Sequence, residues 1–186
     1  MTAQYYMACL DLRGRRCVVV GGGTVGAEKA KGLLACGADV TVVSPELRDD
    51  FRALDVTWRR GRYRRSDLRG AFLVVAATAD RAVNERVHRD AEERRMLCNV
   101  ADVPELCNFI LPAVHREGPI AVAVSTGGAS PALAKRIRND VAAIVTPKHA
   151  ELARRLEGMR PRVKDQFATY EERRDFFESL VEEALA

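Results

Sequence analysis

The chain has 186 residues, of which 47% are hydrophobic and 30% charged, and its formal net charge is +4 at pH 7. This balance is typical of a globular protein with one domain and extensions. The longest uncharged apolar run, AFLVVAATA, is far shorter than the ~20 residues of a membrane span. The N-terminal charges follow the apolar residues, which excludes a typical signal peptide, so we expect no membrane partner and a cytoplasmic location.

The five cysteines and three histidines form no pattern typical of a disulfide framework or a metal site. We therefore expect buried cysteines and no resident metal. Residues 48–69 hold eight Arg and four Asp, an excess equal to the net charge of the whole chain. This segment is either a solvated loop or a surface that attracts a polyanionic ligand. No nucleic-acid-binding motif accompanies it, so we expect no nucleic acid as partner.

Residues 16–111 alternate short apolar runs with helical patterns, which is typical of β-α-β units around a parallel sheet. The apolar runs do not alternate with polar residues, as expected for strands buried on both faces. Five strands are predicted, at residues 16–20, 39–43, 56–58, 72–76 and 97–100. One helix is predicted over residues 24–36, with Gly37 as its C-terminal cap, and another after Asp80 as its N-cap.

The pattern changes after residue 113. Two apolar runs, FILPAV and PIAVAVST, are joined by HREG and predict a hairpin or strand pair outside the main sheet, with His115 in the turn. Three helices are then predicted, and their start signals are Ser130-Pro131, Thr146-Pro147 and a capping box of Thr169 with Glu172. The final helices cannot bury an apolar face alone, so we expect them to pack on the body or on a second subunit.

These patterns predict an α/β fold in three parts. A Rossmann-like parallel-sheet domain is expected over residues 1–113. It is followed by a small strand–helix segment over residues 114–145 and a helical C-terminal domain over residues 146–186.

The stretch GGGTVG follows the first predicted strand and opens the first predicted helix. It fits G-x-G-x-x-G, a weak pattern alone that the β-α-β context strengthens. Gly21 would allow the tight turn, Gly23 would let the backbone approach a pyrophosphate, and Gly26 would allow close helix–strand contact. A tight turn without a ligand is the alternative. The predicted cofactor contacts in this loop are Gly21, Gly22, Gly23, Thr24, Val25 and Gly26.

The second predicted strand ends near Ser44, which is followed by Pro45 and Glu46. An acid about 20 residues after the glycine loop would bind the ribose hydroxyls of NAD, and Glu46 has that spacing. Arg48 lies close enough in the sequence to keep NADP as an alternative cofactor, although the spacing of Glu46 favours NAD. Thr78, at the end of the fourth strand, is a further predicted cofactor contact.

Several motifs resemble one family over about residues 5–180. The stretches LRGRRCVVVGGGTVGAEKAKGLLACGADVTVVSP, DLRGAFLVVAATAD, NVAD, FILPA, VSTGGASPALAKRIR and RVKDQFAT resemble, in order, the precorrin-2 dehydrogenase/sirohydrochlorin ferrochelatase family. This family forms the dehydrogenase–chelatase part of siroheme synthase. The resemblance implies oxidation of precorrin-2 to sirohydrochlorin with NAD⁺ and, in some members, insertion of Fe²⁺ as a substrate. It also implies a homodimer whose central segments, here residues 114–145, intertwine.

The family assigns catalysis to the aspartate of NVAD, and the resemblance carries the role of general base to Asp102. Asp102 follows the last predicted strand, at the sheet edge where such folds bind ligands. An unperturbed Asp has a pKa of ~3.9, so this role calls for burial or a negatively charged neighbour. Alternatively, Asp102 only caps the turn before Pro104. Asn99 and Asn108 flank this edge as turn residues or ligand contacts.

The stretch STGG leads into a predicted helix whose N-terminus would suit the carboxylates of precorrin-2. The predicted substrate contacts are Ser125, Thr126, Gly127 and Gly128. A competing interpretation is a regulatory module that senses NAD(H) without turning over a tetrapyrrole. It explains the glycine loop and the helical tail, but not why an acid and a second glycine-rich loop both follow the sheet. We therefore favour the enzyme.

Overall fold

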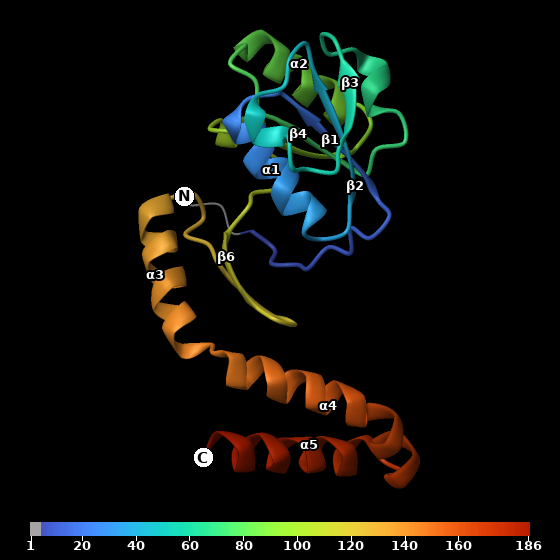
Figure 1. Cartoon of the computed structure of the whole chain (residues 1–186), viewed down its shortest axis with the longest axis vertical. Helices are drawn as coiled ribbons and strands as arrows, with labels where there is room; N and C mark the ends of the chain where they lie inside the picture. Colours follow the sequence, from blue (N-terminus) through green and yellow to red (C-terminus); the bar gives the residue numbers. More distant parts are fainter. Residues whose placement is uncertain (1–4) are drawn as a thin grey trace. The chain divides into compact units, whose positions relative to one another are not determined.

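The computed structural model describes residues 5–186 (Figure 1). The chain forms two compact units, an N-terminal unit that ends at Ile110 and a C-terminal unit over Leu111–Ala186. Within the described range, no helix is long and apolar enough to cross a membrane.

A five-stranded parallel sheet in the order β3-β2-β1-β4-β5 forms the centre of the N-terminal unit. Its strands are β1 (Arg16–Val20), β2 (Asp39–Ser44), β3 (Thr57–Arg60), β4 (Leu73–Ala76) and β5 (Leu97–Val100). All five predicted strands are confirmed, with small shifts at their ends. Residues 17–20 of the central strand β1 are at most 2% exposed, which explains why its apolar run shows no alternation.

Helices α1 (Thr24–Leu34) and α2 (Arg81–Glu92) cover opposite faces of this sheet (Figure 1). Ala30 of α1 packs in one hydrophobic cluster with Val19, whereas Val87 of α2 packs in the other with Val18. Successive residues of β1 thus serve the two faces in turn. Three short 3-10 helices complete the unit, at Asp49–Phe51 (η1), Arg65–Leu68 (η2) and Pro104–Leu106 (η3). This arrangement confirms the predicted Rossmann-like fold.

Both helix caps predicted for this unit are confirmed. Gly37 has a φ of +74° and donates its N–H to the carbonyl oxygen of Leu34 at 2.9 Å, which closes the last turn of α1. At the start of α2, Asp80 Oδ1 accepts the N–H groups of Ala82 at 2.9 Å and Val83 at 3.2 Å.

We expect Asp80→Ala to lower the free energy of unfolding by about 1 kcal/mol, because two N–H groups of α2 lose their acceptor. Urea unfolding followed by circular dichroism measures this loss. Asp80→Asn is the matched control, since an amide oxygen caps a helix nearly as well. Equal stability of Asp80→Ala and the wild type would contradict the capping role.

In the C-terminal unit, β6 (Ala113–Glu117) and β7 (Ile120–Val124) form the predicted hairpin, as an antiparallel sheet of their own. The predicted position of the turn is wrong. Glu117 pairs with Ile120, so the turn lies at Gly118-Pro119 and His115 belongs to β6. There His115 is half-buried, with Nε2 3.4 Å from the carbonyl oxygen of Val145.

The hairpin is followed by α3 (Pro131–Ile144), α4 (Pro147–Gln166) and α5 (Tyr170–Leu185). All three predicted starts are confirmed, since Ser130, Thr146 and Thr169 are the N-caps. Hydrogen bonds from Thr169 hold the pKa of the Glu172 carboxyl below its usual range, as a capping box should.

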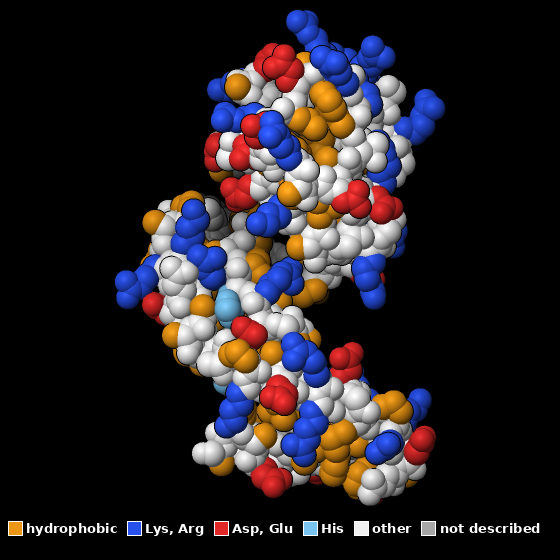
Figure 2. Space-filling model, viewed as in Figure 1, with side chains coloured by type: hydrophobic (Ala, Val, Ile, Leu, Met, Phe, Trp, Pro, Cys, Tyr) orange, Lys and Arg blue, Asp and Glu red, His pale blue; other side chains and the backbone are white. Residues whose placement is uncertain are grey.

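Helix α4 packs on both the hairpin and α5, where the Phe167 and Phe176 ring centroids are 5.2 Å apart. Hydrophobic side chains nevertheless remain at the surface of the last two helices (Figure 2), and Tyr170 is 72% exposed. The tail therefore packs on its own unit and still presents apolar surface.

Candidate active site

The loop between β1 and α1 contains two glycines that close packing requires. Gly21 has a φ of +130°, and a Cβ there would lie 2.3 Å from the carbonyl oxygen of Ala77. A Cβ at Gly26 would lie 2.3 Å from the carbonyl oxygen of Gly21. Gly21 thus makes the tight turn and Gly26 allows α1 to approach β1, as the pattern predicts.

Gly22 is a third glycine that close packing requires, because the end of β2 and the segment after it lie against this position. A Cβ at Gly22 would lie 2.0 Å from the carbonyl oxygen of Glu46 and 2.6 Å from Ser44 Oγ. The N–H of Arg48 also donates to the carbonyl oxygen of Gly22 at 2.9 Å. The segment after β2 is therefore held directly against the glycine loop.

The remaining residues of the loop face open space. No atom lies within 4 Å of the position that a Cβ of Gly23 would take, and Thr24 and Val25 are exposed. No side chain caps the N-terminus of α1, and its first turn contains no acidic residue. Free N–H groups and the positive end of the helix dipole suit an anion. Space and charge here fit the pyrophosphate of a dinucleotide.

The predicted ribose-binding residues differ in exposure. Ser44 is 8% exposed, and its carbonyl oxygen accepts Trp58 Nε1–H at 3.0 Å and the N–H of Gly61 at 3.0 Å. Ser44 is thus bonded to the segment of Trp58 and Gly61 and packs against Gly22 of the glycine loop. Pro45 and Glu46 are exposed, which leaves the Glu46 carboxylate available to a ligand.

Arg48 has a carboxylate neighbour that the sequence analysis missed. Arg48 Nε lies 3.7 Å from Asp50 Oδ2, and the same oxygen accepts the hydroxyl hydrogen of Thr24 at 3.0 Å. The pair is exposed and therefore weak, but it offsets the charge of Arg48 beside the loop. The only signal in the sequence was an acid two residues after Arg48.

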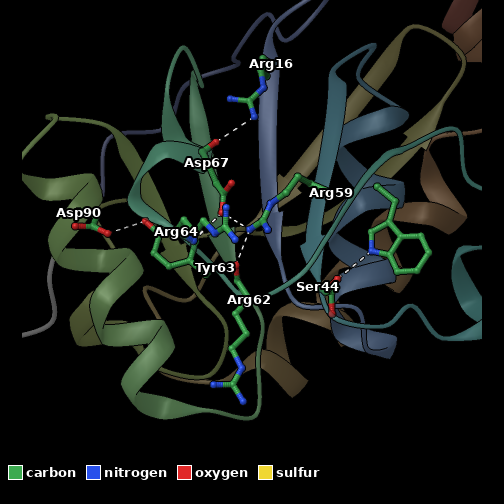
Figure 3. A network of polar contacts seen from close by, with 9 residues as sticks. Arg16, Ser44, Arg59, Arg62, Tyr63, Arg64, Asp67 and Asp90 are labelled. Atoms are coloured by element: carbon green, nitrogen blue, oxygen red, sulfur yellow. Dashed lines mark hydrogen bonds and ion pairs between the residues drawn. The ribbon is translucent and has the colours of Figure 1, made fainter.

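The Arg-rich segment 48–69 forms a network of its own (Figure 3). Arg59 pairs with Asp67 and donates to the carbonyl oxygen of Arg62 at 2.7 Å. The Tyr63 hydroxyl donates to Asp90 of α2 at 2.8 Å. Several Arg residues of the segment are thus paired with carboxylates, which leaves fewer free positive charges for a polyanionic ligand, the alternative to a solvated loop.

Thr78, just beyond β4, is held by a residue that the sequence analysis missed. Its hydroxyl donates to Asn84 Oδ1 at 2.7 Å, and Asn84 Nδ2 donates to the carbonyl oxygen of Thr78 at 3.0 Å. Asn84 is 6% exposed. A polar residue on the buried face of a predicted helix was the sequence feature that could have identified it. The Thr78 hydroxyl thus shapes the turn at the end of β4.

Asp102 lies two residues beyond β5, with a φ of +61°. Pairing of Val20 with Ala76 and of Ala76 with Val100 aligns Asp102 with Thr78 and Gly22 along one sheet edge. Adjacent strands are ~4.8 Å apart, so the ends of β1 and β5, with β4 between them, lie roughly 10 Å apart. Asp102 is exposed, so burial, one of the two conditions expected for a general base beside a negatively charged neighbour, is not met.

The two asparagines near this edge are structural. Asn108 Oδ1 accepts the N–H of Cys98 at 2.7 Å, and Asn108 Nδ2 donates to the carbonyl oxygen of Met96 at 2.8 Å. Asn99 Nδ2 donates to the carbonyl oxygen of Phe109 at 3.0 Å. Both amides hold the segment after β5 against that strand.

The predicted substrate loop, Ser125–Gly128, lies in the C-terminal unit between β7 and α3. Gly127 and Gly128 have φ values of +62° and +88°, which glycine permits. The Thr126 hydroxyl accepts the N–H of Ser130 at 3.0 Å and donates to its carbonyl oxygen at 3.1 Å. The four residues thus form one turn before α3. No cluster of three metal-ligating side chains occurs anywhere in residues 5–186.

Three family models match the chain in order. Residues 8–113 match the model described as "Putative NAD(P)-binding". Residues 117–144 match the sirohaem biosynthesis protein central region, and residues 148–186 match the sirohaem synthase dimerisation region.

Curated relatives and a solved structure agree with these matches. The siroheme synthase of Nitrosomonas eutropha is 38% identical over 187 residues, which cover 98% of this chain and 39% of the relative. Siroheme synthase 2 of Klebsiella pneumoniae is 42% identical over 174 residues, 91% of this chain and 38% of the relative. The chain thus spans well under half of these relatives.

The structure of SirC, a precorrin-2 dehydrogenase, matches with a TM-score of 0.81 and 29% identity. The match covers 98% of this chain and 93% of SirC. The order of the three family models and this full-length likeness show that the chain belongs to the precorrin-2 dehydrogenase/sirohydrochlorin ferrochelatase family, the dehydrogenase–chelatase part of siroheme synthase.

Proposed function

We propose that the chain oxidises precorrin-2 to sirohydrochlorin with NAD⁺, as a step of siroheme biosynthesis. The observation that carries this proposal is the shared sheet edge, where an open, uncapped helix N-terminus and Asp102 lie in one row. An anion site and a carboxylate at this spacing suit a dinucleotide whose reactive end reaches Asp102. The likeness to SirC over nearly the whole of both chains supports the same reaction.

The proposed cofactor is NAD rather than NADP. Glu46 is exposed directly beside Gly22, where a carboxylate accepts hydrogen bonds from the ribose hydroxyls. The charge of Arg48, which would favour a 2′-phosphate, is offset by Asp50. The proposed contacts are those predicted from the sequence: residues 21–26, residues 44–46 and Thr78.

Bound NAD⁺ supplies the hydride acceptor. The N–H groups at the start of α1 would hold its pyrophosphate, and Asp102 would accept the proton that the macrocycle loses in the oxidation. The exposure of Asp102 leaves it accessible to a bulky tetrapyrrole, which would itself cover the carboxylate. The turn Ser125–Gly128 and the start of α3 bind substrate carboxylates. Fe²⁺ insertion, as a second activity with iron as substrate, would use the same carboxylate to accept pyrrole protons.

The three parts of the chain would then have separate tasks. Residues 1–113 bind NAD, residues 114–145 form a dimerisation segment that also contributes to the substrate site, and residues 146–186 complete a homodimer. The match to a sirohaem synthase dimerisation region and the apolar surface left on α5 support this division.

Anaerobic incubation of the purified chain with precorrin-2 and NAD⁺ tests the proposal, with sirohydrochlorin absorbance as readout. We expect sirohydrochlorin to form with NAD⁺, to form more slowly with NADP⁺ and not to form without a nucleotide. Tight NADH binding without turnover would instead support the regulatory module. Fe²⁺ is added after oxidation is complete, and loss of the sirohydrochlorin spectrum only with enzyme present would show the second activity.

A further inference from the structure

The loop that carries Asp102 has a left-handed turn in its backbone. It leaves β5 at Val100 and turns through η3 to Cys107, and Asp102 is one of two non-glycine residues with positive φ among residues 5–186. Asp adopts this left-handed conformation more readily than most residues, and the contacts around the loop decide whether it is held. Around Asp102 itself the backbone supplies one long bond, from the N–H of Val103 to the carbonyl oxygen of Val100 at 3.3 Å, whereas at the base of the loop the N–H of Asn108 donates to the carbonyl oxygen of Cys98 at 3.0 Å.

The Cys107 thiol bonds to both sides of Asp102. Cys107 Sγ accepts the N–H of Val100 at 3.1 Å. The same sulfur lies 3.2 Å from the carbonyl oxygen of Val100 and 3.3 Å from that of Val103, so its single hydrogen can be donated to either. Asn99 Nδ2 approaches it at 3.5 Å. The thiol therefore closes the loop at the residue before Ala101-Asp102 and at the residue after.

The chemistry of this thiol suits a structural bond. Burial raises the pKa of Cys107, so the thiol keeps its proton at neutral pH and can donate while it accepts from Val100. A nucleophilic or redox-active cysteine needs the opposite, a thiolate in an accessible and electropositive site.

We propose that Cys107 is a positioning residue for Asp102: its thiol closes the Val100–Cys107 loop and thereby fixes the left-handed backbone from which the carboxylate meets the substrate. This inference rests on the proposed role of Asp102. It does not require Cys107 to touch substrate or cofactor.

The test compares Cys107→Ala with Cys107→Ser, in the full chain, in steady-state oxidation of precorrin-2. We expect Cys107→Ala to lower kcat roughly 10- to 100-fold, because a displacement of about 1 Å costs about that much in rate. KM for precorrin-2 and the Kd of NAD⁺ should stay within about twofold, since the nucleotide lies on other strands. Cys107→Ser should recover most of the rate, because a hydroxyl donates and accepts at the same place.

The double variant Cys107→Ala/Asp102→Asn separates positioning from general damage. If Cys107 acts through Asp102, its removal costs nothing further once the carboxylate is absent. An equal loss in both backgrounds, or an unchanged kcat in Cys107→Ala, would overturn the inference. Full activity of Asp102→Asn would instead remove the role of Asp102.

Hydrogen exchange measured by mass spectrometry tests the same inference without turnover. Cys107→Ala should exchange faster than the wild type in peptides that span residues 100–107, and equally in peptides from β1 and α1. Unchanged exchange in the loop would overturn the inference even if the wild type oxidised no tetrapyrrole. If the wild type oxidised no tetrapyrrole but Cys107→Ala still exchanged faster in the loop, the loop closure by Cys107 would be supported and the proposed function refuted.

Discussion

Asp102→Asn is expected to lower kcat for precorrin-2 oxidation by about 10²–10⁴-fold, the usual contribution of a general base. Asn matches Asp in size and tolerates the left-handed backbone at φ +61°, so the loop should keep its conformation. The substitution removes only the carboxylate that accepts the proton. Steady-state kinetics measures kcat, and a nucleotide titration should give a Kd for NAD⁺ within about twofold of the wild type.

The matched control for this variant is Glu105→Gln. Glu105 lies in the same loop, within η3, and is also an exposed carboxylate. Its neutralisation changes the net charge by the same amount but removes no proton acceptor from the sheet edge, so kcat should stay close to that of the wild type. If Asp102→Asn kept the wild-type rate, Asp102 would be only a turn residue before Pro104.

The parts of the fold that were predicted from the sequence are those determined by residues close together along the chain. The strand of residues 16–20 is apolar throughout because both faces of β1 are covered, and that burial is visible in composition alone. Helix starts could be predicted at Asp80, Ser130 and Thr169, because an N-cap side chain bonds to N–H groups only two or three residues away in the sequence. The prediction that His115 lies in the turn is wrong because, of the predicted turn HREG, only Gly118 leaves the strand; Gly118 and Pro119 are turn residues, and His115 to Glu117 belong to β6 and pair with β7.

The parts that could not be predicted depend on neighbours that are distant in sequence. Gly22 must be glycine because Ser44, the last residue of β2, and Glu46, two residues beyond it, lie against it. Asn84 is marked only as a polar residue on the buried face of α2, and no motif marks Cys107; each acts by bonding the backbone just beyond or at a strand end. The residues that shape a site at a sheet edge thus come from several strands, and spacing along one chain segment does not reveal them.

The glycine loop itself allows packing and ligand binding to be separated by two neighbouring substitutions. Gly22→Ala places a Cβ 2.0 Å from the carbonyl oxygen of Glu46, so backbone must shift. We expect it to lower the free energy of unfolding by about 1–3 kcal/mol, the usual cost of overpacking. Gly23→Ala meets no atom within 4 Å and has a φ of −86°, which alanine adopts freely. Its midpoint in urea should differ little from that of the wild type.

Gly23→Ala, which should leave stability nearly unchanged, should nevertheless weaken the binding of NAD⁺. The open space beside Gly23 is where a pyrophosphate would approach the start of α1, so a methyl group there should raise the Kd of NAD⁺ at least about tenfold, since each ~1.4 kcal/mol of lost contact is one factor of ten. Isothermal titration of the folded variants measures this. A normal Kd in Gly23→Ala would mean that no ligand lies over the loop and that the three glycines serve only the strand–helix turn. A raised Kd with unchanged stability would instead assign the open half of the loop to the dinucleotide, because the two effects then arise at adjacent residues for separate physical reasons.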